Sequence, residues 1–142
     1  MNLVIDASVL IKFFVPEILS ESSGKLLDRV EEGEVHLLAP DLIYSEVGNI
    51  LWKKHRLKEL TLSETDEITG AMLSLPLQGE AIKPLLPLAL SLAIAYRVTV
   101  YDATYLSLAT IYETRLVTAD RKLVDAIAKT ELKKHIEWIG NY

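Results

Sequence analysis

The 142-residue chain contains no cysteine and only three histidines. The lack of cysteine excludes disulfide bonds, thiolate metal sites and cysteine nucleophiles, and it is compatible with a reducing cytoplasm. The histidines, His36, His55 and His135, share no spacing typical of a metal site, so we expect no zinc ligands among them. The side chains left for metal binding are those that carry oxygen.

Long apolar runs and an excess of basic charge are missing as well. The formal net charge is -5, so the chain as a whole does not attract nucleic acid or anionic membranes. The most apolar run, residues 85–95, is too short to span a bilayer and contains Pro87. The N-terminal run holds Asp6 and Lys12 and lacks a basic leader. We therefore expect a cytoplasmic protein with no membrane segment, and a buried or interface helix at 85–95.

Half of the residues are hydrophobic and a quarter are charged, which indicates a single domain over residues 1–142. Short apolar runs predict strands at residues 2–5, 35–39, 80–82, 98–101, 116–118 and 136–139. Helical patterns lie between them, at residues 8–15, 20–32, 42–56, 63–75, 87–96, 102–113 and 121–129. This alternation predicts an α/β domain with a mainly parallel sheet and helices on both faces. In such sheets, sites form at the carboxyl ends of the strands.

Three aspartates stand at predicted strand ends: Asp6, Asp102 and Asp120. Asp is also a favoured helix N-cap, and this simpler role explains each of them taken singly. The ends of parallel strands, however, bring carboxylates to a common edge, where like charges raise one another's pKa unless a cation intervenes. The clustering of the three is therefore the functional prediction.

Glu46 is a fourth candidate, within the helix predicted at 42–56. Its helical phase places it on or beside the apolar stripe, and Asn49 points the same way. A surface ion pair with Lys53 or Lys54 is the alternative. Oxygen ligands without histidine or cysteine favour Mg²⁺ or Mn²⁺. Such ions polarise a phosphoryl oxygen and neutralise charge on a leaving oxygen, which indicates phosphodiester hydrolysis.

Four segments together resemble the PIN-domain ribonucleases, and most closely the single-domain toxins of VapBC-type toxin-antitoxin pairs. They are VIDASVLIK at 4–12, SEVGNIL at 45–51, YDATYLSLA at 101–109 and LVTADRKL at 116–123. The resemblance implies a three-layer α/β/α sandwich whose acidic pocket binds one or two Mg²⁺ or Mn²⁺ ions and cleaves RNA. It also implies a homodimer and a small antitoxin that covers the acidic groove.

The resemblance assigns roles residue by residue. The catalytic and metal-binding quartet would be Asp6, Glu46, Asp102 and Asp120. Ser8 and Thr118 would be supporting hydroxyls that hydrogen-bond to carboxylates or water, and Asn49 would be a supporting amide. Water would attack the phosphorus in line, which predicts products with a 5'-phosphate and a 3'-hydroxyl.

Local cations are the expected route for RNA to an acidic protein. The candidates for RNA contact are Lys12, Lys53, Lys54 and Arg56. The alternative for the basic run at 53–58 is a solvated helix end whose cations complement the helix dipole.

Two other classes of protein remain open. A Mg²⁺-dependent aspartyl phosphotransfer domain or phosphatase also uses aspartates at strand ends. The phosphatase pattern, however, needs a second Asp where this chain has Ser8, and the acid pair of a phosphotransfer domain is not evident. A non-catalytic PIN domain that binds RNA or protein is the second alternative. The presence of all four acids argues against it.

Overall fold

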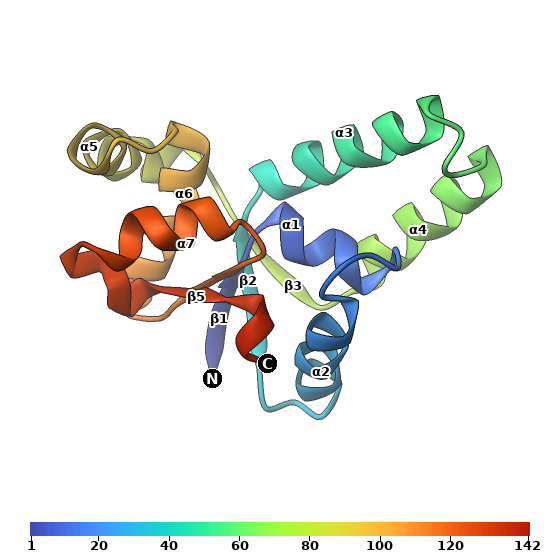
Figure 1. Cartoon of the computed structure of the whole chain (residues 1–142), viewed down its shortest axis with the longest axis horizontal. Helices are drawn as coiled ribbons and strands as arrows, with labels where there is room; N and C mark the ends of the chain where they lie inside the picture. The colour runs from blue at the N-terminus through green and yellow to red at the C-terminus, as the bar shows by residue number, and fades with distance from the viewer.

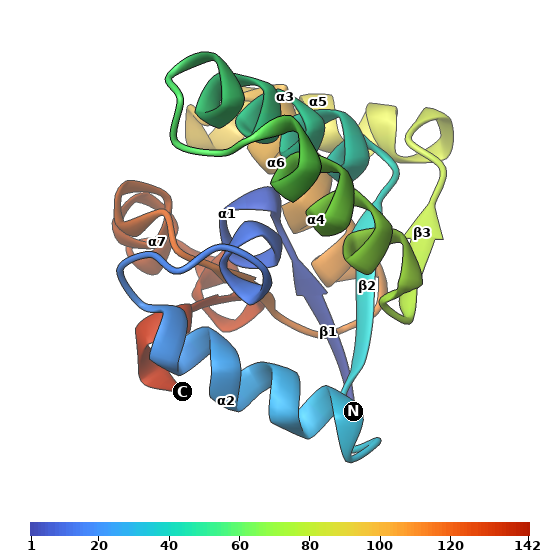
Figure 2. The ribbon, with the colours of Figure 1, turned by 90° about the vertical axis from the view of Figure 1, so that its right-hand side faces the viewer.

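The computed structural model describes residues 1–142 and has a five-stranded, wholly parallel sheet between two layers of helices (Figures 1 and 2). The strands are β1 (Asn2–Ile5), β2 (His36–Pro40), β3 (Leu77–Glu80), β4 (Leu116–Thr118) and β5 (Ile136–Trp138). Their spatial order is β3-β2-β1-β4-β5, so β1 is central and β3 and β5 are the edges. The expected α/β/α sandwich with a mainly parallel sheet is confirmed.

Helices cover both faces of the sheet. They are α1 (Ala7–Leu10), α2 (Ser20–Glu31), α3 (Leu42–Arg56), α4 (Leu62–Ser74), α5 (Leu86–Tyr96), α6 (Val100–Ile111) and α7 (Arg121–Ala128). Short 3-10 turns are η1 (Ile11–Phe13), η2 (Lys83–Leu85), η3 (Glu131–His135) and η4 (Ile139–Asn141). In Figure 1, α1 to α4 lie to the right of the strands and α5 to α7 to the left.

The central strands are apolar because they are covered on both faces. Residues 3–5 of β1 and 116–118 of β4 are completely buried, as expected for inner strands of a parallel sheet. Their carboxyl ends are therefore the places where the chain leaves the core and polar side chains reach solvent.

The strand predicted at 98–101 is wrong, and Asp102 does not stand at a strand end. The Thr99 hydroxyl accepts a hydrogen bond from the Asp102 amide at 3.1 Å and caps α6, which begins at Val100. A Thr cap stabilises a helix start locally, and here it outweighs the β-branched character of the segment. The predicted strand at 80–82 also lies earlier, at Leu77–Glu80.

Helix α5 is less buried than residues 85–95 led us to expect. Leu86, Leu90 and Ile94 are 49%, 48% and 73% exposed. Only the small side chains of Ala89 and Ala93 are buried within α5, next to α6. Of the two expectations for this helix, deep burial is wrong, because α5 lies at the margin of the molecule (Figure 1) and buries only Ala89 and Ala93, while the interface stays a prediction.

No single helix has the length and apolar character needed to cross a membrane. Residues 83–96 and α6 meet that test only as a pair bent by 113°.

Candidate acidic active site

Asp6 occupies the turn between β1 and α1 and is buried there. One carboxylate oxygen accepts hydrogen bonds from the Ser8 hydroxyl at 2.5 Å and the Val9 amide at 3.2 Å. The other oxygen accepts one from the Thr118 hydroxyl at 2.5 Å. Asp6 is thus the N-cap of α1 and, at the same time, a carboxylate held in place by two hydroxyls.

Ser8 and Thr118 also connect the turns that follow β1 and β4. The Ala119 amide donates to the Ser8 hydroxyl at 2.9 Å, and the Asp120 amide donates to the Thr118 hydroxyl at 3.0 Å. Because each hydroxyl contacts both Asp6 and the chain beside Asp120, the two strand ends are held in a defined relative position.

Asp120 caps the next helix. Its side chain accepts a hydrogen bond from the Leu123 amide at 3.1 Å at the start of α7. Like Asp6, it follows a strand and precedes a helix, so capping and membership of an acidic cluster are compatible. Asp102, by contrast, reaches the same cavity from the first turn of α6.

Glu46 on α3 is held by a tyrosine on another helix. The Tyr105 hydroxyl donates to Glu46 Oε1 at 2.5 Å, although the two residues are 59 positions apart in the chain. Tyr105 is 2% exposed, so its ring fills the core while its hydroxyl reaches the cavity. No role was assigned to Tyr105 from the sequence; the signal that could have found it is its position three residues after Asp102, on the same helical face.

The side chains described above line one cavity of about 220 Å³. Its polar lining consists of Asp6, Ser8, Glu46, Asp102, Tyr105 and Asp120. The structure thus brings together the four acids that the sequence singled out. Thr118 lies behind Asp6, whereas Asn49 is exposed on α3 and does not line the cavity.

Burial and mutual repulsion make the acids harder to ionise. Burial raises the pKa of Asp6 to about 6, against the hydrogen bonds from Ser8, Thr118 and Val9, and the Asp102 charge adds to the rise. Burial also raises the pKa of Glu46, opposed by the Tyr105 hydrogen bond, and that of Asp102, to which the Asp120 charge contributes. A cation in the cavity would relieve this repulsion.

The donor set fits a hard divalent cation. All the side-chain donors that line the cavity are oxygens, as Mg²⁺ and Mn²⁺ prefer. No three acidic or histidine side chains form a complete metal cluster by themselves. Water would have to supply the remaining ligands, which is usual for Mg²⁺ held by one or two carboxylates.

Two of the four cations suggested for RNA contact are engaged by one acid. Glu17 binds Lys12 at 2.9 Å and Lys54 at 2.8 Å. Partial burial opposes ionisation of Glu17, but its hydrogen bonds to Lys54 and Lys12 and their charges lower its pKa. Lys53 is exposed, and the Arg56 guanidinium lies 5.0 Å from the centre of the Trp52 ring.

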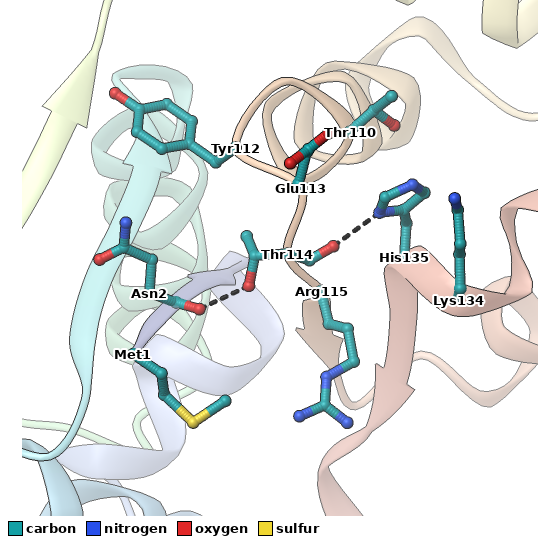
Figure 3. Close-up of a pocket in the computed structure, with 9 residues that line it drawn as sticks. All are labelled: Met1, Asn2, Thr110, Tyr112, Glu113, Thr114, Arg115, Lys134 and His135. Carbon is teal, nitrogen blue, oxygen red and sulfur yellow. Dashed lines mark hydrogen bonds between the residues drawn. The ribbon is translucent and has the colours of Figure 1, made fainter.

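A larger hollow, of about 680 Å³, lies at the amino ends of β1 and β4 (Figure 3). Two of its polar side chains contact backbone atoms: the Thr114 hydroxyl donates to the Asn2 carbonyl, and His135 Nδ1 lies 2.7 Å from the Thr114 carbonyl. Tyr112 and Arg115 instead bind the carboxylates of Glu80 and Glu137. The contacts to backbone atoms join the amino ends of neighbouring strands, so the role of Thr114 and His135 in this hollow is to stabilise the fold.

Comparison with known proteins finds a family match over most of the chain. The family model described as PIN domain matches residues 3–129. The chain is also 35% identical over 127 residues to Ribonuclease VapC3 of Pyrobaculum aerophilum, which covers 88% of this chain and 94% of that protein.

Solved structures show the same fold. PAE2754 from Pyrobaculum aerophilum, at 25% identity, covers 99% of this chain and 85% of its own with a TM-score of 0.72. VapBC2 from Rickettsia felis was solved bound to a DNA fragment from its promoter. At 12% identity, the match covers 97% of this chain and 98% of the Rickettsia chain, with a TM-score of 0.70.

Proposed function

The chain belongs to the PIN-domain family, and on that premise we propose that it is a metal-dependent endoribonuclease, the toxin of a toxin-antitoxin pair. The observation that carries this proposal is the convergence of Asp6, Glu46, Asp102 and Asp120 on one cavity, with three pKa values raised. The ribonuclease name of the 35% identical relative supports RNA as the substrate class.

One or two of the four carboxylates, with water as the remaining ligands, would hold each Mg²⁺ or Mn²⁺ ion. When bound, the ion supplies positive charge that stabilises the transition state of phosphodiester hydrolysis and lowers the pKa of water. This role requires ionised carboxylates at fixed positions, and the chain's own hydrogen bonds fix the positions and oppose the rise in pKa that burial causes.

Ser8 and Thr118 donate to the two oxygens of Asp6, which favours the ionised form and fixes the plane of the carboxylate. Tyr105 does the same for one oxygen of Glu46. The Asp6 and Asp120 backbones are fixed by the strand ends that carry them. The chain thus presents oriented oxygens to an RNA phosphate, whose ester bond is cleaved by water.

Hydrolysis by water predicts a 5'-phosphate and a 3'-hydroxyl on the products. The test is to incubate the protein with structured and single-stranded RNAs in Mn²⁺ or in EDTA and to analyse the new ends. Cleavage only with the metal, lost in Asp102→Asn, is the expected result. A 2',3'-cyclic phosphate would contradict the scheme. Formation of an aspartyl-phosphate from a small phosphodonor would favour the phosphotransfer alternative.

An antitoxin and a second copy of this chain are the proposed partners. Solved relatives include a toxin-antitoxin complex from Klebsiella pneumoniae, and a short upstream reading frame would support an antitoxin here. We place the protein in the cytoplasm, with its RNA substrate. For the homodimer, α5 contains no charged residue and exposes Leu86, Leu90 and Ile94 along one face.

Leu90→Asp tests the proposed dimer. It adds a charge to the exposed face of α5 and leaves the buried Ala89 and Ala93 untouched. Sedimentation should show a dimer for the wild type and a monomer for the variant. A wild-type monomer would contradict this part of the proposal without affecting the nuclease assignment.

A further inference from the structure

We propose that the outer edge of the sheet binds the RNA strand where it leaves the acidic cavity. We call this surface the β5 edge and define it by Arg115, Arg121, Lys133, Lys134 and Trp138, which line a hollow of about 490 Å³ along β5 and α7. The inference rests on the proposed ribonuclease function and names the surface that would hold its substrate.

The β5 edge concentrates positive charge on an acidic protein. Four cations line the hollow, of which Arg115 pairs with Glu137 at 3.0 Å and Arg121 pairs with Asp125 at 3.3 Å. Lys133 and Lys134 are exposed, and neither forms an ion pair. Unpaired cations in a groove attract a phosphate backbone whatever its sequence.

An aromatic ring with a fixed position lies among these cations. The Arg121 guanidinium lies 4.6 Å from the centre of the Trp138 ring. Gly140 packs so close to the ring that a Cβ there would fall 2.5 Å from a ring atom. Surfaces that bind single-stranded nucleic acid combine cations with aromatic rings on which bases stack, and arginine adds cation–π contacts. The β5 edge contains both kinds of group.

The β5 edge begins next to the acidic cavity. Arg121 directly follows Asp120 in the chain, as the first residue of α7. Trp138 is the register partner of Thr118, whose hydroxyl binds Asp6. A strand cleaved at the carboxylates would therefore meet Arg121 and Trp138 one strand further out in the sheet.

The basic end of α3 is a weaker candidate for the same role. Glu17 pairs with Lys54 and with Lys12, and Glu59 lies 3.5 Å from Lys54. These carboxylates compete with phosphate for the cations. Lys53 and Arg56 form no ion pair either, as is true of Lys133 and Lys134. The β5 edge is favoured as the path of RNA because its four cations line a single hollow together with Trp138.

The test is RNA binding by a pair of double variants, both made in the cleavage-deficient Asp6→Asn protein. Lys133→Ala with Lys134→Ala removes two cations of the β5 edge. Lys122→Ala with Lys129→Ala removes the same charge from exposed positions that do not line the hollow. Fluorescence anisotropy with a labelled single-stranded RNA of about 12 nucleotides reports affinity at several salt concentrations.

We expect the β5-edge pair to bind RNA about tenfold more weakly, with a salt slope shallower by about 1.4, as loss of two phosphate contacts implies. The control pair should stay within about twofold of the parent protein. Equal weakening by both pairs would show only general electrostatic attraction and would overturn the inference.

Arg121→Ala and Trp52→Ala separate the two possible paths. Arg121 is exposed, so its loss should not unfold the chain, and we expect severalfold weaker RNA binding as the stack on Trp138 is lost. Trp52 carries the other arginine stack, on α3. Weakening by Trp52→Ala but not by Arg121→Ala would place the RNA over α3 and overturn the inference.

Hydrolysis of bis(p-nitrophenyl) phosphate separates this inference from the proposed function. The lysine variants, made in the otherwise native protein, should hydrolyse this small diester at the wild-type rate, since it does not reach the β5 edge. If RNA is cleaved and both double variants bind it equally, only the inference fails. If the protein neither binds nor cleaves RNA, both fail. Loss of antitoxin binding with unchanged RNA affinity would reassign the surface and overturn the inference.

Discussion

The two ends of the central strands differ in a way that identifies the functional end. At the amino ends, the hollow of Figure 3 is the larger, but it contains no cluster of carboxylates: Thr114 and His135 contact backbone atoms that join β1, β4 and η3, and its cations Arg115 and Lys134 also belong to the β5 edge. At the carboxyl ends, a cavity of about 220 Å³ gathers four carboxylates that repel one another. Concentrated like charge, rather than size, distinguishes the site.

Among the substitutions that test this difference between the two strand ends, Asp6→Asn should have the largest effect, and the effect should be on RNA cleavage. The substitution keeps the shape of the side chain but removes a charge from the acidic cavity. We expect RNA cleavage to fall about 10²–10³-fold, as for loss of a group that acts directly on the transition state. Initial rates in Mn²⁺ measure the change, with circular dichroism as a control for folding. Unaltered cleavage would contradict the assignment of the acidic cavity.

The stability of the metal-free protein should depend on Asp6 and on pH. Because burial raises the pKa of Asp6 from 3.8 to about 6, the folded chain binds the proton more tightly than the unfolded chain. Stability should therefore fall as pH rises from about 4 to about 6, by up to about 3 kcal/mol. Urea denaturation of the wild type and of Asp6→Asn at several pH values measures the free energy of unfolding. The variant should lack the part of the pH dependence that comes from Asp6. Identical pH profiles would show that the Asp6 pKa is not raised.

Tyr105→Phe should have an intermediate effect. The variant keeps the ring in the core and removes the hydroxyl that holds Glu46. We expect about tenfold weaker Mn²⁺ binding, measured by titration calorimetry, and a similar loss of cleavage, because groups that orient metal ligands contribute on this scale. Tyr101→Phe is a matched control, since Tyr101 is 63% exposed. Unchanged metal affinity would limit Tyr105 to packing.

Thr114→Val should have the smallest effect and should act on stability alone. It removes the hydroxyl that donates to the Asn2 carbonyl at the opposite end of the strands. We expect a loss of about 1 kcal/mol in the free energy of unfolding and no change in RNA cleavage. A clear loss of cleavage by the folded variant would mean that the hollow of Figure 3 takes part in the reaction.

Local sequence patterns predicted the bounds of helices and strands correctly where the residues that fix those bounds lie close together in the chain. The helix expected at 42–56 and the strand expected at 116–118 have those bounds in the structure. The prediction of a strand at 98–101 was wrong. The apolar residues of the segment fit a strand, but Thr99 caps a helix that begins at Val100. The apolar run favours a strand and the Thr cap favours a helix, and the sequence pattern alone does not show which of the two is stronger.

The sequence by itself determined the parallel α/β architecture, and it singled out Asp6 and Asp120 by strand-to-helix turns and Glu46 by its helical phase, all of which are encoded locally. Asp102 was singled out by a strand end that the structure lacks and by the resemblance of its segment to the PIN-domain family. Only the tertiary structure decided that Tyr105 binds Glu46, that Thr118 binds Asp6 across 112 positions, and that Arg121 stacks on Trp138. Only the tertiary structure, too, left α5 half exposed, because burial of an apolar helix depends on what packs against it. Contacts between distant segments depend on how the layers pack, and no short stretch of sequence contains that information.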